Sequence, residues 1–397
     1  MSKLKVTTIS DPDNDNEAIT VDTSGNVSVS SNLKVNTIQD TTGNDALTID
    51  SFGNVTASQG FVPSTQLSHR NLIINGAMQV AQRGTSVTGV TGGGYRTCDR
   101  MYSSFSSLGT WTIDQSTDAP NGFSNSFKVT TTTADTSPGT GDYASVSYWV
   151  EAQDLQCLGY GTSGAKTSVI SFWVKSNKTG DASFNVRQLD NSNKNFSSAY
   201  TINLADTWEQ KTIVIPADTS GVINNDNGGG FAIEWFINSG SNYTSGSHSS
   251  TYTTFSNTNR NPSNLGVGGA TSDYFAITGI QLEVGSVATP FEHKSYGEEL
   301  ARCERYYQDT GLFRYKLAGR WATNSGNVLC EYRMSTPMRS APSVSVRTSF
   351  QTGDAYVGNP SISGATNKAF LMEGSSSFSA NAIGYFHNGA LKLDAEL

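Results

Sequence analysis

The sequence predicts an all-β protein made of several β-domains in a row. Three observations predict this fold class: a repeat of short alternating strands at the start, longer alternating strands through the rest of the chain, and a single segment with helical periodicity. Charged residues make up only 15% of the 397 residues, which excludes a coiled coil. The expected parts are an N-terminal β-repeat shaft over 1–62, a linker over 63–94, a central β-sandwich over 95–293, an amphipathic helix over 294–308 and a small C-terminal β-sandwich tip over 309–397.

The first sixty residues contain two copies of one unit. Leu4–Ile9 recurs as Leu33–Ile38, and Ala18–Asp22 recurs as Ala46–Asp50, with a period of 28 to 29 residues. A unit this small cannot bury a core alone, and two copies are too few for a self-sufficient solenoid. We therefore expect identical chains to intertwine about a threefold axis, which predicts a homotrimer with a thin, β-rich shaft.

The segment Asp11–Glu17 resembles a calcium-binding loop in one respect, since its carboxylates stand at alternate positions. Asn16 stands where such a loop needs glycine, and Asp22 stands where it needs glutamate. We interpret the segment as a solvated turn. The histidines and cysteines form no pair at metal-ligand spacing either, so we expect no metal site, no cofactor and only buried free thiols. The four cysteines are Cys98, Cys157, Cys303 and Cys330.

Longer strands indicate a β-sandwich in the middle of the chain. In Val169–Lys175 every second residue from Ile170 is apolar, and Phe231–Ile237 alternates in the same way. We expect the tryptophans of this region to pack in the core or against a sheet. Further strands are predicted over Tyr143–Val150, Ser183–Leu189, Lys211–Ile215 and Tyr274–Glu283, and the tryptophans are Trp173, Trp208 and Trp235.

These strands also carry a resemblance. Thr167–Lys175, Asp206–Pro216 and Tyr274–Glu283 resemble, in pattern and order, the strands of the jelly-roll carbohydrate-binding modules attached to cellulases and xylanases. The likeness spans about 120 residues and implies a jelly-roll fold that binds carbohydrate. Thr278 and Gly279 stand where that family usually carries an aspartate, so we expect no calcium site there.

Two long and unusual segments bracket the sandwich. Arg70–Thr85 and Gln281–Gln308 together cover 44 residues and resemble segments of tail-fibre and receptor-binding proteins of tailed bacteriophages. Met334–Pro342 resembles a proline-bounded turn common in fibre-tip domains of the same family. The resemblance implies a virion protein whose N-terminal repeats attach to tail, neck or head proteins and whose distal domains touch the host.

The second bracketing segment contains the one predicted helix. Ser295 and Glu298 form the pattern of a capping box, and Glu298 and Arg302 are spaced for an i, i+4 ion pair. The helix is expected either to pack on its own domain or to lie near the threefold axis. In the second case its apolar face would supply the trimer contacts, which are Leu300, Cys303 and Tyr307.

The last ninety residues return to strands and form a small domain that gains stability from trimerisation. The strands are predicted over Leu312–Arg320, Asn327–Arg333, Ser343–Thr348, Ala369–Met372 and Ala382–Leu393.

Composition disfavours several function classes. A net charge of −8 and a pI near 5.1 leave no basic field for nucleic acid. No apolar run reaches the roughly 18 to 20 residues that a membrane-spanning helix needs. No acid, base or nucleophile stands out, so we expect no catalytic residue and no enzyme activity. A glycan-degrading tailspike is the alternative, because a carboxylate pair cannot be recognised from spacing alone.

Aromatic residues are the better candidates for a glycan site, since a sugar ring stacks on an aromatic face while amides bind its hydroxyls. Tyr148 and Trp149 are neighbours in a strand, so one of them must face away from the core. The long polar loop Ser239–Gly269 is the other candidate surface, unless it is merely solvated or disordered. Its candidate residues are Asn242, Tyr243, Tyr252 and Asn257.

These observations predict a structural virion fibre, synthesised in the host cytoplasm, that binds a host surface polysaccharide through its distal β-domains. A head or neck (collar) fibre with secondary host contact is the main alternative.

Overall fold

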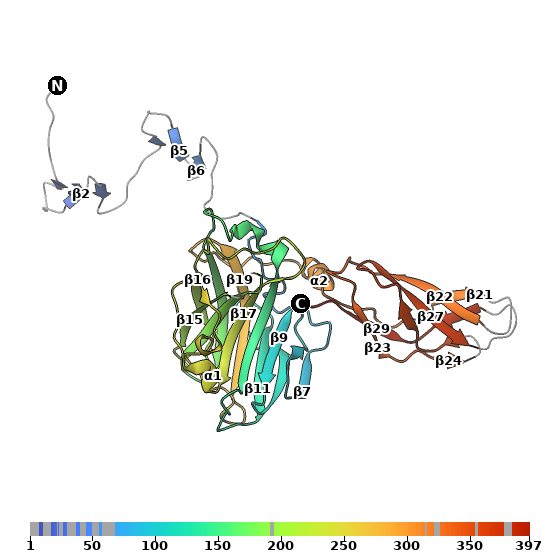
Figure 1. The fold of residues 1–397 in the computed structure, drawn as a ribbon. Coiled ribbons are helices and arrows are strands. Elements are labelled where there is room, and N and C mark those ends of the chain that lie inside the picture. Colours follow the sequence, from blue (N-terminus) through green and yellow to red (C-terminus); the bar gives the residue numbers. More distant parts are fainter. Residues whose placement is uncertain are drawn as a thin grey trace. The chain divides into compact units, whose positions relative to one another are not determined.

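The computed structural model describes residues 8–10, 17–21, 23, 27–29, 37–39, 45–49, 55–57, 68–190, 194–313, 316–320, 326–353, 356–376 and 383–397. The chain divides into two compact units, Met1–Ser64 and Thr65–Leu397 (Figure 1). The division falls two residues after the predicted end of the shaft. The acidic turn that begins at Asp11 lies outside the described residues.

The two sequence repeats form two small sheets with the same strand order. In each, the middle strand pairs antiparallel with the other two, and the register shifts directly after the isoleucine of the first strand, Ile9 or Ile38. The sequence repeat is therefore one three-stranded structural unit. Intertwining about a threefold axis stays a prediction. The strands are β1 (Thr8–Ser10), β2 (Glu17–Val21) and β3 (Val27–Val29), then β4 (Thr37–Gln39), β5 (Asp45–Ile49) and β6 (Val55–Ala57).

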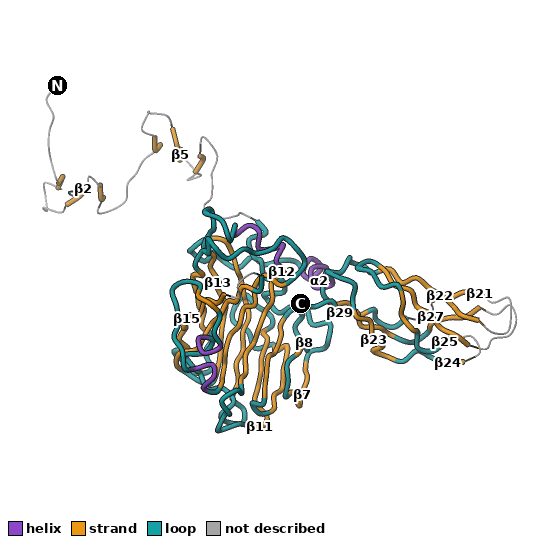
Figure 2. Tube along the Cα trace, in the orientation of Figure 1, coloured by secondary structure: helices purple, strands orange, loops and turns teal. Residues whose placement is uncertain are grey.

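The centre of the second unit is a sandwich of two antiparallel sheets (Figures 1 and 2). The six-stranded sheet has the order β16-β13-β19-β11-β10-β7. Its strands are β7 (Ser86–Val90), β10 (Thr110–Ser116), β11 (Ser126–Thr133), β13 (Ser168–Ser176), β16 (Glu209–Ile215) and β19 (Tyr274–Val284).

The seven-stranded sheet has the order β18-β15-β14-β17-β12-β9-β8. Its strands are β8 (Gly94–Tyr95), β9 (Met101–Ser106), β12 (Tyr143–Glu151), β14 (Gly180–Gln188), β15 (Lys194–Ile202), β17 (Gly229–Ser239) and β18 (Thr253–Thr254). Each of the six strands predicted in this region is present, and the predicted sandwich is confirmed.

Alternate residues of the strands fill the core between the sheets. Ile170, Phe172 and Val174 of β13 and the matching residues of β17 are completely buried there. Trp235 of β17 belongs to this core, as expected. Trp173 points to the other face of β13 and is only half-buried.

The prediction of a linker over 63–94 is wrong. Ile73 and Met78 lie in the sandwich core, and β7 is an edge strand of the six-stranded sheet. The N–H of Leu72 donates to the carbonyl of Leu282 at 2.9 Å, so the segment also runs beside β19. The short apolar run Leu72–Ile74 and the single apolar residues after it show no strand periodicity, which is why the sequence pattern did not show this packing.

The predicted helix is α2 (Tyr296–Glu304). Ser295 caps it as expected, because its hydroxyl accepts the N–H of Glu298 at 3.3 Å. Arg302 pairs with Glu299 at 3.3 Å, not with Glu298 as predicted. Glu299 faces inward and is buried, so its carboxylate is held in place while that of Glu298 is exposed.

The two segments that bracket the sandwich in the sequence fold against each other. The N–H of Asn71 donates to the carboxylate of Glu292 at 3.0 Å, and the N–H of Asn75 donates to that of Glu299. A small buried cluster joins them, made of Ile74, Val80, Cys303 and Tyr306. The residues that carry the phage-fibre resemblance therefore build one structural joint beside the sandwich.

The tip domain consists of three small sheets around its own core. The turn Met334–Pro342 inserts Met338 into that core with no exposed surface. The single strand predicted over Ala382–Leu393 is two strands in the structure, β28 (Ile383–Phe386) and β29 (Ala390–Asp394). The sheets are β20 (Tyr307–Asp309), β29 (Ala390–Asp394) and β23 (Ser343–Thr348); β21 (Lys316–Arg320), β28 (Ile383–Phe386), β25 (Tyr356–Val357) and β24 (Thr352–Gly353); and β22 (Gly326–Arg333), β27 (Ala369–Ser376) and β26 (Ser361–Ser363).

Candidate functional site

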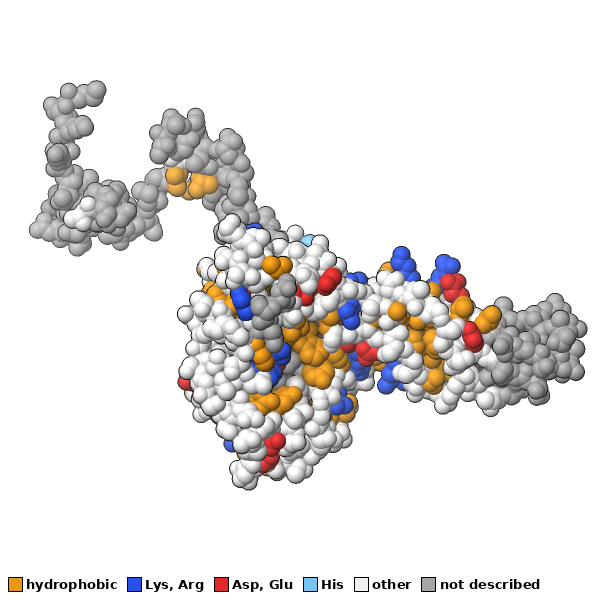
Figure 3. All heavy atoms as spheres, in the orientation of Figure 1, with side chains coloured by type: hydrophobic (Ala, Val, Ile, Leu, Met, Phe, Trp, Pro, Cys, Tyr) orange, Lys and Arg blue, Asp and Glu red, His pale blue; other side chains and the backbone are white. Residues whose placement is uncertain are grey.

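The structure separates the two predicted aromatic neighbours on β12. Tyr148 is 1% exposed, and its hydroxyl accepts the N–H of Ile74 at 2.8 Å, so it belongs to the core and its assignment to a glycan surface is wrong. Trp149 faces outward and is half-buried against Tyr95 and Tyr102, with ring centres 6.1 and 4.9 Å away. Figure 3 shows hydrophobic side chains gathered on the visible face of the sandwich.

Parts of the long polar loop after β17 lie on the outer face of the seven-stranded sheet, whereas β18 extends the edge of that sheet and Leu265 and Val267 enter the sandwich core. Tyr243, in the short helix α1 (Ser241–Thr244), is buried against Tyr143 and Phe236. Tyr252 packs on the sandwich core next to Tyr160. Tyr243 is buried, so its assignment to a glycan surface is wrong, whereas Tyr252 is partly buried and packs inward on the core.

The two predicted asparagines of this loop are exposed. Asn257 accepts a hydrogen bond from Arg260 at 3.1 Å, and Asn242 follows Gly240 at the start of α1. Asn242 lies beside Gly141, and the Arg260 that binds Asn257 lies 6.0 Å from the ring centre of Tyr143, whereas Trp149 is at the other end of β12. The six predicted glycan residues therefore do not form one site.

A buried ion pair fixes this loop to the sheet. Arg260 donates to both carboxylate oxygens of Glu234, at 3.1 and 2.5 Å, and its guanidinium lies 4.9 Å from the ring centre of Phe236. Both charged side chains are at most 10% exposed. The centre of the outer face of the seven-stranded sheet is thus covered by the protein's own chain.

The outer face of the six-stranded sheet carries a hollow of about 550 Å³. Trp173 of β13 lies opposite Gln210 of β16, and both contribute to its floor. Phe123 comes from the loop before β11, and Phe291 and His293 come from the loop after β19. The remaining lining is uncharged: Asn121, Gly122, Thr212, Ala288, Thr289 and Pro290.

The three loop aromatics of the hollow contact one another, two of the pairs at steep angles and Phe123 with His293 at 40°. Phe123 and Phe291 lie 5.0 Å apart at 71°, and Phe291 and His293 lie 4.8 Å apart at 70°. Such edge-to-face contacts are favourable and leave ring faces turned in different directions. The aromatic rings beside Trp173 are therefore inclined to one another and do not form a flat platform.

The loop that carries Phe291 is held by two buried side chains of β19. Glu283 accepts the N–H and the hydroxyl of Thr289, at 2.8 and 2.7 Å. Gln281 donates to the carbonyls of Thr289 and Pro290 and accepts the N–H of Glu292 at 2.8 Å. The bracketing segment that begins at Gln281 thus fixes one wall of the hollow.

Gly279 makes room for the aromatic residues of the hollow. Its φ of +61° belongs to the left-handed region, and β13 and β19 shift register beside it. A Cβ at this position would lie 2.7 Å from Phe123 and 2.9 Å from Trp173. The Thr278–Gly279 pair therefore forms a bulge that lets both rings approach the strand.

Sequence reasoning placed Trp173 with the packing tryptophans and did not consider Phe123, Phe291 or His293. A signal for Trp173 was available, because it alternates with Ile170, Phe172 and Val174 and so falls on the outer face. The other three lie in loops, and no periodicity marks a loop residue that folds back over a sheet.

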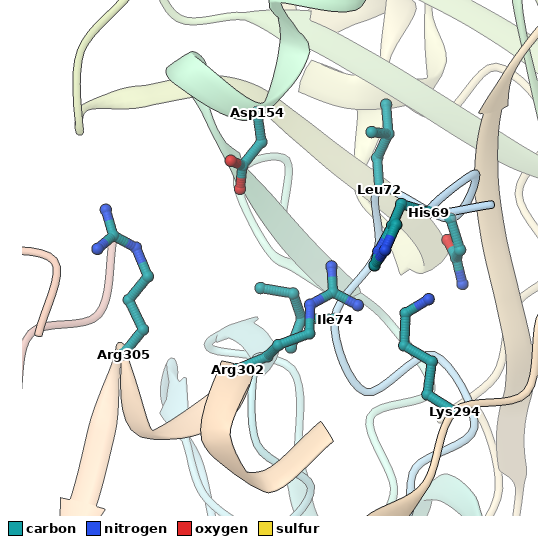
Figure 4. Close-up of a pocket in the computed structure, with 8 residues that line it drawn as sticks. His69, Leu72, Ile74, Asp154, Lys294, Arg302 and Arg305 are labelled. Atoms are coloured by element: carbon teal, nitrogen blue, oxygen red, sulfur yellow. The ribbon is translucent and has the colours of Figure 1, made fainter. Parts of the chain in front are cut away.

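A second cavity, of about 270 Å³, lies between the start of the second unit, the 3₁₀ helix Ala152–Leu158 and α2 (Figure 4). Lys294 and Arg302 point into it, with Asp154 on the opposite wall. Each of its cationic side chains already has a carboxylate: Lys294 with Glu292 at 3.0 Å, Arg302 with Glu299 at 3.3 Å and Arg305 with Glu151 at 2.6 Å. The carboxylates of Glu292 and Glu299 also accept N–H groups of the first bracketing segment, and Glu151 belongs to β12, so the three cations neutralise carboxylates with structural roles.

The predicted trimer contacts are used within the chain itself. Cys303 and Tyr307 are 0% and 2% exposed, so they have no surface for another chain and their assignment is wrong. Leu300 packs partly buried against the cluster around Ile74. The alternative in which the helix packs on its own domain is the one observed.

Within the described ranges, no group of three or more histidine, cysteine or acidic side chains is arranged to hold a metal ion. In the same part of the chain, no helix is long and apolar enough to cross a membrane.

No protein-family model matches the sequence, and no curated protein matches it. Similar solved structures include the enzymatically active domain of tailspike protein 4 of bacteriophage CBA120, with 13% identity over 54% of this chain and a TM-score of 0.29. The match covers only 21% of that solved chain.

Carbohydrate-binding modules of Clostridium thermocellum are also similar. The family 11 module of the cellulase Lic26A-Cel5E aligns over 55% of this chain and 97% of its own, with 14% identity and a TM-score of 0.26. The family 22 module of Xyn10B aligns over 58% and 100%, with 9% identity and a TM-score of 0.26. At such TM-scores the similarities assign neither a ligand nor an activity to this chain.

Proposed function

We propose that this protein is a fibre subunit of a tailed-phage virion that binds an uncharged host surface glycan in the hollow around Trp173. The observation that carries the proposal is the hollow itself: aromatic faces from three segments surround exposed amide and hydroxyl groups, with no carboxylate or lysine in its lining. Sugar rings bind to such surfaces through their C–H faces and hydroxyls.

Binding rather than cleavage fits this geometry. Hydrolysis of a glycosidic bond generally needs two carboxyl groups on either side of the bond, and the lining offers none. The loop that carries Phe291 is also held by Gln281 and Glu283, which favours a preformed binding surface.

The fibre assignment is supported by the resemblance of 70–85 and 281–308 to phage fibre segments, and by the way these segments pack together. The N-terminal repeats would attach to other virion proteins, and a homotrimer is the proposed assembly. A head or neck fibre remains the alternative mounting. Sedimentation of the full chain and localisation in a virion reconstruction test the assembly and its position, and a monomer absent from particles would refute both.

The binding proposal is tested with the full chain on host cell-wall polysaccharide and a glycan array. Trp173→Ala should weaken binding by about 2 kcal/mol, roughly thirtyfold, if the ring stacks on the sugar. Trp149→Ala, a half-buried tryptophan on the opposite sheet, is the matched control and should bind normally. The reverse result would move the site to the seven-stranded sheet, and released oligosaccharides would refute binding without cleavage.

A further inference from the structure

A cavity of about 360 Å³ lies where the sandwich meets the tip domain. The sandwich contributes Arg83, Val87, Tyr95 and Arg96, and the other wall comes from Tyr307 of β20 and from strands β23 and β29. The residues from these two strands are Ser343, Ser345, Lys392 and Asp394.

Contacts between the sandwich and the tip domain fix the walls of this cavity. The guanidinium of Arg83 lies 3.6 Å from the ring centre of Tyr307 and pairs with Asp394 at 3.2 Å and Glu396 at 3.3 Å. The hydroxyl of Tyr95 donates to the carbonyl of Leu397 at 3.3 Å. The cavity is therefore a defined space within the second unit.

Two of the three cations that line the cavity have no acidic partner. Arg83 is balanced by the carboxylates of Asp394, Glu396 and Asp99, whereas Arg96 and Lys392 face only the Asp394 carboxylate that Arg83 already engages. Among the described residues, neither Arg96 nor Lys392 forms an ion pair with an acidic side chain. Arg96 donates only to the carbonyls of Gly92 and Gly93, at 3.1 Å each.

Several buried polar atoms of the lining lack a hydrogen-bond partner within the described part of the chain. They are the hydroxyl of Tyr307, Nε of Arg96 and Nη1 of Arg83, the last of which lies 3.8 Å from Oδ1 of Asp99 in an ion pair. Tyr307 is 2% exposed and the Arg83 side chain 8%. All three atoms are able to donate, and a buried donor without an acceptor is costly.

We propose that this cavity binds a compact oxyanion, the carboxylate or phosphate group of a small hydroxylated ligand such as an acidic sugar. The unpaired cations supply the charge, the unpartnered donors supply hydrogen bonds, and the exposed serines of β23 suit hydroxyl groups. A volume of 360 Å³ lies in the range of small-ligand pockets. This site differs in place and chemistry from the Trp173 hollow and does not depend on it.

Calorimetric titration of the full chain with D-glucuronate, glycerol 3-phosphate and D-glucose tests the proposal. At least one of the two anions should bind, and glucose should not. Binding of glucuronate alone assigns an acidic sugar, binding of the phosphate alone assigns a phosphorylated ligand, and binding of both assigns a general oxyanion site. Failure of both anions to bind overturns the proposal.

Variants locate the binding. Lys392→Gln removes a charge that holds no ion pair and should weaken anion binding about tenfold, whereas Asp394→Asn removes the only lining carboxylate and should strengthen it. Lys368→Gln, the same change at an exposed position outside the cavity, is the control. Equal affinity in the Lys392 and Lys368 variants, with thermal unfolding unchanged, would place the anion elsewhere and overturn the proposal.

Discussion

At the scale of single residues, Asp218 shows how the sandwich keeps a carboxylate in a site that is 6% exposed. Lys194 pairs with it at 2.8 Å, and the N–H groups of Ser220 and Gly221 donate to it at 2.9 and 3.0 Å. Burial alone would raise the pKa of this carboxyl. The hydrogen bonds from Lys194, Ser220 and Gln188 outweigh burial and hold the pKa well below its usual range.

Because the folded-state pKa of Asp218 is depressed, its contribution to stability is present above pH 3.8 and is lost as the pH falls below that value. Asp218→Asn should therefore lower the free energy of unfolding by about 1 to 3 kcal/mol at neutral pH, with a smaller loss in acid. Urea unfolding across the pH range measures this. Asp181→Asn, at an exposed carboxylate, is the control, and a loss for Asp218→Asn that is independent of pH would contradict the assignment.

The contrast between Trp173 and Tyr148 shows what alternation does and does not reveal about single residues. Alternation correctly predicted which residues of β13 share a face, and it required that Tyr148 and Trp149 point to opposite faces. It could not tell which face would be covered by loops. That depends on long-range contacts such as the Arg260–Glu234 pair, 26 residues apart in the chain.

At the scale of elements, strong alternation predicted β12, β13, β14, β16, β17 and β19, whose observed bounds differ by at most three residues from the predicted ones. Strands rich in serine and threonine were missed, and β11 (Ser126–Thr133) and β15 (Lys194–Ile202) are examples. Both strands supply core residues, such as Phe127 and Phe196, but serine and threonine fill most other positions, so the apolar pattern is weak and pairing with neighbouring strands fixes them.

Helix α2 was predicted with its cap because capping and helical spacing are local signals. Its packing partner was not predictable, since Ile74 and Val80 lie more than 200 residues earlier in the chain. Leu300→Asp should therefore destabilise the chain itself by about 2 to 4 kcal/mol, because it places a charge against this apolar cluster.

Thermal unfolding of Leu300→Asp, with Glu298→Gln as the exposed control, measures the effect. Glu299 is unsuitable as a control, because its carboxylate is buried and accepts the N–H of Asn75. Loss of trimers with unchanged thermal stability of each chain would instead place Leu300 at an interface between chains.

At the scale of the whole second unit, the sandwich and the tip are joined by the last residues of the chain. Arg100, 1% exposed, pairs with Glu396 and also donates to the carbonyl of Trp149 at 2.5 Å. Arg339 of the tip donates to the carbonyls of Asn227 and Ala395. Figure 2 shows the described strands of both domains. Sequence patterns predicted the two domains but gave no indication of this contact between them, because Arg100 and Glu396 lie 296 residues apart in the chain.

The contact between the sandwich and the tip should depend most on the buried ion pair of Arg100 and Glu396. Glu396→Gln leaves the Arg100 guanidinium in a buried site without a negative partner, and breaking one side of such a pair typically costs about 3 to 5 kcal/mol. Asp394→Asn removes a carboxylate that also pairs with Arg83 but is 43% exposed, so we expect a loss of about 1 kcal/mol or less.

Limited proteolysis and calorimetry of the full chain distinguish two outcomes. If the tip undocks in Glu396→Gln, it should become sensitive to protease at a lower temperature than the sandwich, while glycan binding at Trp173 persists. A single unfolding transition at the wild-type temperature would show that the remaining contacts, including those of Arg339, suffice to hold the two domains together.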